Sequence, residues 1–265
     1  MIFEFDGTKL YYETHGNTGR PLLLLHGWGG KCESWKPVIR DFENEYKLIV
    51  VDFPGHGRSS DPSSPWSVTE YARLITGLLD HLGIEEADII GHSFGGRVAI
   101  VLSAERPKRV GRVVLTGTAG LIPERSWLMK CRKRLFSTFR KSFDSGIVRV
   151  ILGARRADAI AEKLAVKFGS EDYRHLNKLM RKTFVRIVEQ DLAPYLHKIA
   201  APVTLVWGEA DTETPLWMGH TMEREIPNAK LHVLPNCGHY AYLDRYSDFK
   251  IISKRFLARA EGTWN

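Results

Sequence analysis

The stretch "DIIGHSFGGRVAI", residues 88–100, passes from an apolar run into an apolar helical pattern through a short turn. Ser93 lies in the middle of this turn, with Gly91 two residues before it and Gly95 two residues after it. In a sharp strand-to-helix turn the apex residue is strained, and small neighbours let the strand and the helix pass closely. The pattern therefore predicts an exposed, nucleophilic serine at a helix N-terminus. A glycine-rich turn with a serine cap is the alternative.

Short apolar runs on both sides of this turn predict a sheet. Near-continuous apolar runs are typical of parallel strands that are covered on both faces. The runs are residues 22–27, 47–53, 87–93, 112–117, 202–208 and 230–235.

Helical patterns lie between these runs. In the clearest one, Ser67 and Glu70 form a capping box before apolar residues at helical spacing, and Gly83 ends the helix. The helix that begins near Phe94 is expected to end before Pro107. Strands that alternate with helices predict an α/β fold with a mainly parallel sheet.

The N-terminal segment and the middle segment of the chain differ in pattern from the alternating strands and helices. Asp6-Gly7 between two alternating segments predicts an N-terminal hairpin. Residues 121–199 contain no convincing strand and carry basic helical stretches at 126–143 and 157–169. We therefore expect a core made of residues 1–120 and 200–265, with residues 121–199 as a helical cap over the edge of the sheet.

Length and composition limit the classes of protein. The 265 residues suffice for one sizeable core, and no apolar run approaches the roughly 20 residues of a membrane span. The N-terminus lacks the pattern of a signal peptide. Cys32, Cys131 and Cys237 are widely spaced and form no CxxC pair, so neither a metal site nor a cofactor site is predicted. Reduced thiols in a cytoplasmic protein are the simplest interpretation.

Ser93 needs a base to become a nucleophile. Of the ten histidines, His239 fits best, because it follows the apolar run 230–235 in the glycine-containing loop "NCGHY". The alternative is an ordinary histidine on a surface loop. The remaining candidates are interpreted as packed or at an edge (His232), as solvated (His175, His197 and His220), or as structural with a place near the pocket as the alternative (His56).

An orienting acid should follow a strand and precede the histidine in the chain. Asp211 meets both conditions, four residues beyond Trp207 in "LVWGEADTETP". Its neighbours Glu209 and Glu213 are interpreted as solvated loop carboxylates. The other place for the acid, the loop "TGTAG" after the run 112–117, contains no carboxylate, which favours Asp211.

The developing oxyanion needs two backbone N–H groups. Phe94 supplies one, because it follows the nucleophile. The loop "HGWGG" at 26–30 suits the other, with Trp28 as the donor, since glycines let the backbone approach a ligand. A plain glycine-rich turn is the alternative.

At this point the chain resembles the α/β-hydrolase superfamily. The resemblance depends on residues 26–30, the loop "DFPGHGRS" at 52–59, Ser93, Asp211 and His239, in this order and spacing. It covers nearly the whole chain apart from the cap. It implies an eight-stranded, mostly parallel sheet with a helical cap and no required cofactor.

One departure concerns the segment after the histidine. Many relatives carry a Glu and then a Pro before the last helix, and Asp244 and Tyr246 occupy those places here. This departure affects the start of a helix more than the chemistry.

A serine at the turn also argues against the epoxide hydrolases and haloalkane dehalogenases, which use Asp there. "SFGG" is similar to the turn of enzymes that cleave vinylogous diketones and of a menaquinone-pathway lyase.

The first hypothesis is a carboxylesterase-like serine hydrolase that cleaves a small ester or related acyl substrate through an acyl-enzyme. His239 would deprotonate Ser93, Asp211 would orient His239, and the N–H groups of Trp28 and Phe94 would hold the oxyanion. The enzymatic alternative is a C–C bond hydrolase or lyase for a carboxylate-bearing substrate. The non-catalytic alternative is a ligand-binding module, for which an intact Ser–Asp–His set has no purpose.

The net charge of +7 is unevenly distributed. Residues 121–200 contain 18 Lys and Arg against 8 Asp and Glu, whereas the rest of the chain contains 20 against 23. Such charge runs are usually solvated helix faces, and no nucleic-acid motif accompanies them. We therefore expect a small-molecule substrate, with an anionic one as an option, and no nucleic-acid partner.

Overall fold

The computed structural model describes residues 1–122, 173 and 175–258. The chain divides into two compact units, one made of residues 1–121 and 185–265 and the other of residues 122–184. The first unit holds the sheet and every residue of the predicted site. The basic stretches at 126–143 and 157–169 lie outside the described residues.

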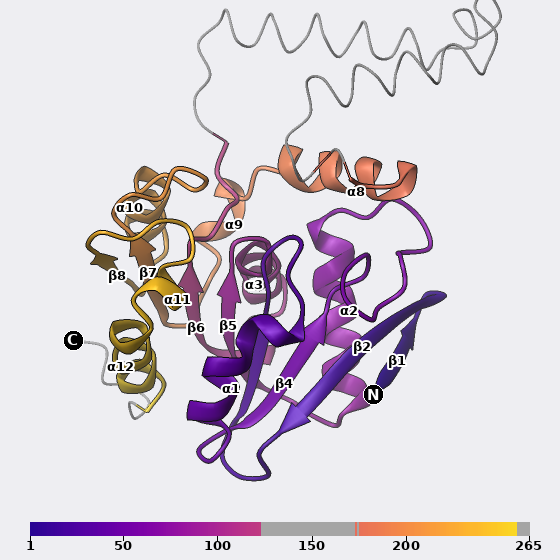
Figure 1. The fold of residues 1–265 in the computed structure, drawn as a ribbon, viewed down its shortest axis with the longest axis horizontal. Helices are drawn as coiled ribbons and strands as arrows, with labels where there is room; N and C mark the ends of the chain where they lie inside the picture. The colour runs from indigo at the N-terminus through magenta and orange to yellow at the C-terminus, as the bar shows by residue number, and fades with distance from the viewer. Residues whose placement is uncertain (123–172, 174, 259–265) are drawn as a thin grey trace, which may run out of the picture. The chain divides into compact units, whose positions relative to one another are not determined.

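The first unit is built on an eight-stranded, mostly parallel sheet, as predicted. Its order is β1-β2-β4-β3-β5-β6-β7-β8, with β1 and β8 at opposite edges (Figure 1). Only the pairs β1/β2 and β2/β4 are antiparallel. The strands are β1 (Ile2–Phe5), β2 (Thr8–His15), β3 (Pro21–Leu25), β4 (Lys47–Asp52), β5 (Ala87–His92), β6 (Val110–Thr116), β7 (Val203–Gly208) and β8 (Ala229–Leu234). Each predicted apolar run thus forms a strand.

The N-terminal hairpin forms where the Asp6-Gly7 pair predicts it. Both residues have positive φ, 48° and 73°. A two-residue hairpin turn with left-handed backbone at both positions matches the twist of the strands that it connects. The turn therefore sets the antiparallel register in which Phe5 faces Thr8.

Helices cover both faces of the sheet, because each buried strand sends alternate side chains to opposite sides. In β3, Leu23 and Leu25 enter one apolar cluster, and Leu22 and Leu24 enter the other. The first cluster includes residues of α2 (Val68–His81), α3 (Phe94–Glu105), α9 (Ala193–Leu196) and α10 (Trp217–Glu225). The second includes residues of η1 (Cys32–Trp35), α1 (Lys36–Phe42), α11 (Ala241–Asp244) and α12 (Tyr246–Leu257).

The ends of the helices follow the local signals. At the start of α2, the Glu70 carboxylate accepts from the Ser67 N–H and the Ser67 hydroxyl accepts from the Thr69 N–H. Gly83 has φ 64° just beyond the end of α2, where a left-handed residue stops a helix. The short helix η2 (Pro107–Arg109) follows α3, which ends before Pro107 as predicted.

Tyr246, which departs from the pattern of the relatives, is the first residue of α12. Its hydroxyl lies 2.6 Å from the Pro37 carbonyl oxygen and 2.9 Å from the Asp41 carboxylate. The tyrosine thus starts the last helix and ties it to α1, which agrees with the expectation that this departure affects a helix start.

The segment 186–190 returns the chain to the first unit at the end of α8 (Lys178–Glu189). The buried Arg97 of α3 donates from Nη1 to the carbonyl oxygens of Ile187, at 2.9 Å, and Gln190, at 3.2 Å. Burial lowers the pKa of Arg97 to about 10. The Gln190 side chain in turn accepts from the Val68 N–H at 2.9 Å. These contacts attach the segment to the helix that follows Ser93.

The residues of the predicted site follow the carboxyl-terminal ends of the parallel strands. Ser93, Gly117 and the loop with Asp211 follow β5, β6 and β7 directly, and His239 follows β8. The carboxyl ends of parallel strands lie at the same edge, which is where α/β proteins place their ligands. No helix within the described ranges is long and apolar enough to cross a membrane.

Candidate active site

Ser93 occupies a strained turn between β5 and α3. Its backbone has φ 50° and ψ −107°, a conformation that residues with a side chain rarely adopt. The turn is held because the Ser93 N–H donates to the Thr116 carbonyl oxygen at 3.1 Å. A methyl group on Gly95 would collide with the Leu25 carbonyl oxygen, so this position accepts only glycine. The strained strand-to-helix turn is therefore present as predicted, whereas Ser93 is half-buried rather than exposed.

Asp211 and His239, the predicted acid and base, are in direct contact. Asp211 Oδ2 lies 3.0 Å from His239 Nδ1, and both side chains are buried. A carboxylate only accepts hydrogen bonds, so Nδ1 carries a hydrogen and donates it. In the neutral imidazole the other nitrogen, Nε2, then keeps its lone pair. This is the tautomer that accepts a proton at Nε2.

The Asp211 carboxylate is anchored by its own turn. Oδ1 accepts from the N–H groups of Glu213, at 2.9 Å, and Thr214, at 2.8 Å, and Oδ2 accepts from the Thr214 hydroxyl at 2.6 Å. Burial alone would raise the pKa of Asp211, but the hydrogen bonds from His239 and Thr214 hold it below its usual value. Asp211 is therefore ionised and fixed in orientation at neutral pH.

Two contacts bring the His239 loop to the serine turn. A methyl group on Gly117 would lie 3.2 Å from His239 Nδ1, and Gly117 directly follows Thr116, which holds the Ser93 N–H. On the other side, His92 Nε2 lies 3.1 Å from the His239 carbonyl oxygen. The Ser93 hydroxyl and His239 Nε2, both among the described residues, form no hydrogen bond with each other. Such bonds often tighten only when substrate is bound.

His92 is buried and neutral. Its Nε2 faces a carbonyl oxygen, so Nε2 is the nitrogen that carries the hydrogen. Burial and the nearby His239 lower the pKa of His92 to about 3. The ring also packs against Tyr240 and Tyr242 at centroid distances of 5.2 and 4.8 Å. His92 thus supports the His239 loop in its neutral form, through one hydrogen bond.

The loop 26–30 lies directly against the serine. A methyl group on Gly27 would lie 3.3 Å from Ser93 Cβ, and the Gly30 N–H donates to the Gly27 carbonyl oxygen at 2.9 Å. The Trp28 indole packs edge-on against Phe94 with ring centroids 5.4 Å apart. As the first residue of α3, Phe94 has an N–H without an acceptor inside its own helix.

His26 holds this loop in place. The Phe53 N–H donates to His26 Nε2 at 2.9 Å, so Nε2 is the acceptor and Nδ1–H donates to the Gly27 carbonyl oxygen at 2.7 Å. Burial, followed by the repulsion of the nearby His56, lowers the pKa of His26 to about 3. A single neutral tautomer of His26 therefore joins the loop 26–30 to the end of β4.

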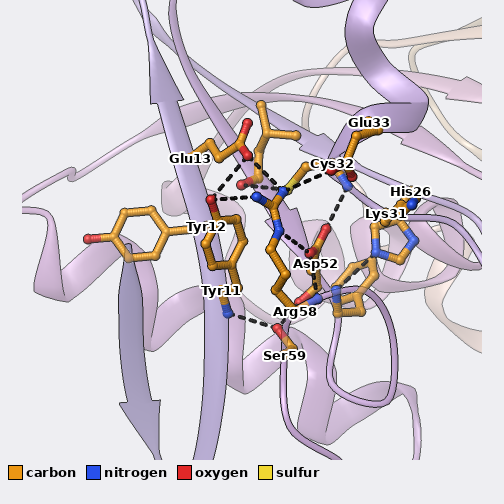
Figure 2. Close-up of polar contacts among 12 residues, drawn as sticks. Tyr11, Tyr12, Glu13, His26, Lys31, Cys32, Glu33, Asp52, Arg58 and Ser59 are labelled. Carbon is orange, nitrogen blue, oxygen red and sulfur yellow. Dashed lines mark hydrogen bonds and ion pairs between the residues drawn. The ribbon is translucent and has the colours of Figure 1, made fainter.

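Asp52, the last residue of β4, joins the start of η1 to the loop that carries Arg58 (Figure 2). The buried Asp52 accepts from the Cys32 N–H at 2.6 Å and from the Arg58 N–H at 2.8 Å. The Arg58 guanidinium lies 3.8 Å from the centre of the Tyr11 ring and 2.7 Å from the Glu13 carboxylate. Segment 52–59, which carries part of the family resemblance, thus has a structural role, because its hydrogen bonds fix the loop that contains His56.

His56 packs edge-on against Trp28. It is buried, its Nδ1 lies 3.2 Å from the Pro54 carbonyl oxygen, and its ring lies 4.6 Å from that of Trp28. The structural interpretation of His56 therefore agrees with its packing, in contact with a residue of the predicted oxyanion loop. His197 and His220 are exposed, as expected, and His232 is part of the edge strand β8.

The two glutamates beside Asp211 differ from each other. Glu209 is exposed and accepts from the Asn236 N–H at 3.4 Å. Glu213 is also exposed, but its Oε2 lies 3.5 Å from His239 Nε2. Its interpretation as only a solvated carboxylate is therefore incomplete.

Three side chains that contribute to this geometry were not identified from the sequence as site residues. Thr214 binds Asp211, with its hydroxyl 3.2 Å from His239 Nδ1, His92 supports the His239 loop, and Glu213 faces Nε2. Only Thr214 has a local signal, since an Asp side chain often captures N–H groups two and three residues ahead.

Across residues 1–122, 173 and 175–258, no group of three or more His, Cys, Asp and Glu side chains is arranged to hold a metal ion. Cys32 and Cys237 are buried free thiols, and burial raises the pKa of both. Cys131 lies outside the described residues.

Comparison with known proteins agrees with the fold. A family model for the alpha/beta hydrolase fold matches residues 20–246. An uncharacterised hydrolase of Bacillus subtilis is 28% identical over 89% of this chain and 90% of its own length. A 2-hydroxy-6-oxononadienedioate/2-hydroxy-6-oxononatrienedioate hydrolase of Burkholderia vietnamiensis is 30% identical over 96% of this chain and 93% of its own length.

A solved structure extends the likeness in three dimensions. The enol-lactonase of Burkholderia xenovorans has a TM-score of 0.74 at 22% identity, over 98% of this chain and 100% of that protein. Because the family model covers most of the chain and the sheet has the matching architecture, this protein belongs to the alpha/beta hydrolase fold family.

Proposed function

We propose that the protein is a serine hydrolase that cleaves a small ester or related acyl substrate through an acyl-enzyme. The single observation that best supports this is the contact of 3.0 Å between Asp211 Oδ2 and His239 Nδ1, at the sheet edge where Ser93 takes its strained conformation. A base with one fixed tautomer at the same end of the sheet as a half-buried serine on a strained turn is an arrangement suited to acyl transfer.

In the acylation step, Ser93 Oγ attacks the carbonyl carbon while its proton passes to His239 Nε2. The electron pair of the carbonyl bond moves onto oxygen, and the N–H groups of Trp28 and Phe94 stabilise that charge. The bond to the leaving alcohol then breaks, and His239 returns the proton to the alcohol oxygen. Asp211 stabilises the imidazolium that exists between the two transfers.

In the deacylation step, His239 Nε2 takes a proton from water, and the resulting hydroxide attacks the acyl carbon. The bond to Ser93 Oγ breaks, the serine regains the proton from His239, and the acid product leaves. No redox change occurs, and no metal or cofactor is needed for either step. The strained serine conformation keeps Oγ at the helix N-terminus throughout.

Cleavage of a C–C bond in a carboxylate-bearing substrate is the second candidate. It is favoured by the relative from Burkholderia vietnamiensis, whose name describes such a hydrolase and whose sequence is 30% identical to this one. The same serine, histidine and aspartate would serve both reactions. The substrates differ in charge and in the bond that is cleaved, so a direct comparison of the two separates them.

The function is tested first at Ser93. Wild-type protein and Ser93→Ala are exposed to a fluorophosphonate probe and then weighed intact by mass spectrometry. We expect one adduct on the wild type and none on the variant, with unchanged circular dichroism. Labelling of the variant at another serine, with its ester turnover kept, would contradict the assignment. An unlabelled wild type would favour the non-catalytic ligand-binding module.

The substrate class is tested next. Neutral esters of increasing acyl length and a 2-hydroxy-6-oxo dienoate are supplied at equal concentration, and kcat/KM is measured for each. We expect the short neutral esters to be turned over faster. A higher kcat/KM for the dienoate would assign C–C cleavage instead. We further propose that residues 121–199 form a helical cap and that the protein is cytoplasmic.

A further inference from the structure

Glu213 places a carboxylate on the substrate side of the predicted base. Its Oε2 lies 3.5 Å from His239 Nε2, the nitrogen that exchanges a proton with serine and leaving group. His239 has a side-chain exposure of 6%, whereas that of Glu213 is 62%. The glutamate side chain is therefore largely solvent-exposed, and its carboxylate is turned toward His239 Nε2.

The position of Glu213 is fixed by the catalytic geometry itself. The Glu213 N–H donates to Asp211 Oδ1 at 2.9 Å, and the next residue, Thr214, binds both carboxylate oxygens of Asp211. The Trp207 indole also donates to the Thr214 carbonyl oxygen at 2.7 Å. The hydrogen bonds that hold Asp211 therefore also hold the backbone of Glu213. The Cα position from which the Glu213 side chain extends is thus fixed.

The charge of Glu213 is not neutralised by a neighbouring cation in the described part of the chain. The one basic side chain there that comes within 4.0 Å of its carboxylate is that of His239, which is neutral in the tautomer that accepts the serine proton. The other titratable groups around His239 do not offset it. Asp211 is itself anionic, and the buried His92 is held neutral.

We infer that Glu213 is a specificity-determining residue, which selects esters whose alcohol part carries a positive charge and disfavours those whose alcohol part carries a carboxylate. The inference rests on the ester hydrolysis proposed above. During acylation the leaving oxygen comes within hydrogen-bond distance of Nε2 to receive its proton, which puts it within about 7 Å of the Glu213 carboxylate. An ammonium group a few atoms further on meets that carboxylate directly.

The size of the effect follows from distance and exposure. One unit charge at about 6 Å, at an effective dielectric constant between those of water and of a protein surface, changes kcat/KM by roughly tenfold. Since the Debye length at physiological salt is about 8 Å, added salt weakens the preference without removing it. The same charge disfavours a second carboxylate in the leaving fragment of a dicarboxylate substrate.

The test uses three esters with one short acyl group. They are a choline ester, its uncharged tert-butyl analogue and an ester of a hydroxy acid. We measure kcat/KM for each with the wild type, with Glu213→Gln and with Glu209→Gln as the matched control. We expect the wild type to prefer choline over neutral over acid ester, and Glu213→Gln to reduce each preference about tenfold. Glu209→Gln, two residues on the other side of Asp211, should keep the wild-type ratios within about twofold.

A second readout keeps this inference separate from the proposed reaction. The dissociation constants of the three corresponding amides, whose acyl bond is far harder to cleave than that of an ester, are measured by calorimetry with the same proteins. If no ester is hydrolysed, the proposed reaction is wrong, while the amide ratios still report on Glu213. Equal charge preference in the wild type and Glu213→Gln, in the amides and in any ester turned over, would overturn the inference.

Discussion

The imidazole Nε2 of His92 lies 3.1 Å from the main-chain carbonyl oxygen of His239, across 147 positions of the sequence. His92 is the residue just before the serine of the turn, and His239 is the predicted base. One hydrogen bond therefore joins the strand that leads to the proposed nucleophile, Ser93, to the loop that carries the proposed base. The bond needs a neutral His92 with its hydrogen on Nε2, and burial provides the neutral form.

This requirement predicts a loss of stability in acid. His26 and His92 have pKa values of about 3 in the folded protein, against 6.5 when exposed. Between these values the unfolded chain binds protons that the folded protein does not, so stability is full above pH 6.5 and falls as the pH falls. At pH 5 each histidine costs about 2 kcal/mol of unfolding free energy relative to pH 7.

The measurement is urea unfolding at pH 7 and pH 5. The difference between the two pH values should shrink by about 2 kcal/mol in His92→Asn, because that variant has one buried histidine fewer. His220→Asn, which replaces an exposed histidine in α10, serves as the control and should keep the wild-type difference. An unchanged pH dependence in His92→Asn would mean that His92 accepts a proton in the folded protein.

Replacement of Asp211 by Asn tests the orientation of the base. An amide nitrogen can donate to His239 Nδ1, which leaves the hydrogen on Nε2, the wrong nitrogen for taking the serine proton. We expect kcat to fall by about 10³- to 10⁴-fold, by analogy with the triad of serine proteases, while KM changes little. Glu209→Gln is the control for loss of a nearby carboxylate. A kcat within tenfold of wild type would show that another group orients His239.

Thr214→Val removes the hydroxyl that binds Asp211 Oδ2 at 2.6 Å and keeps nearly the same shape. A hydrogen bond to a charged acceptor contributes about 1.5–3 kcal/mol, so we expect kcat to fall about tenfold or more. The pKa of Asp211 should rise because its charged form loses a donor. Thr214→Ser retains the hydroxyl and should keep most of the activity. Equal rates in both variants would mean that the hydroxyl is not used.

Gly95→Ala tests the close packing under the serine turn. The new methyl group would meet the Leu25 carbonyl oxygen, a backbone atom that cannot move without shifting β3. We expect a loss of about 3 kcal/mol or more in unfolding free energy. Gly238→Ala is the matched control, since a methyl group there meets no atom within 4 Å, and it should change stability by less than about 0.5 kcal/mol. Equal stability of the two variants would show that the turn relaxes.

Local features could be predicted because they are encoded within a few residues. The Asp6-Gly7 turn, the Ser67–Glu70 capping box and the strand–Ser93–helix turn each depend on side chains close together in the chain. The apolar runs likewise predict strands, because burial on both faces requires them. Asp211 and His239 followed from the same logic, as residues placed just after strands that end at one edge.

Contacts between distant loops could not be predicted in this way. His92 meets the His239 loop, Glu213 turns toward the base, and Arg58 pairs with Glu13, because the sheet places β2, β4, β5, β7 and β8 in a particular order. The sequence alone determined the strands, the helices α2 and α3, the serine turn and the residue types of the proposed site. Which side chain faces which nitrogen of His239 was decided only by tertiary packing, since those distances depend on strand order and on hydrogen bonds between separate loops.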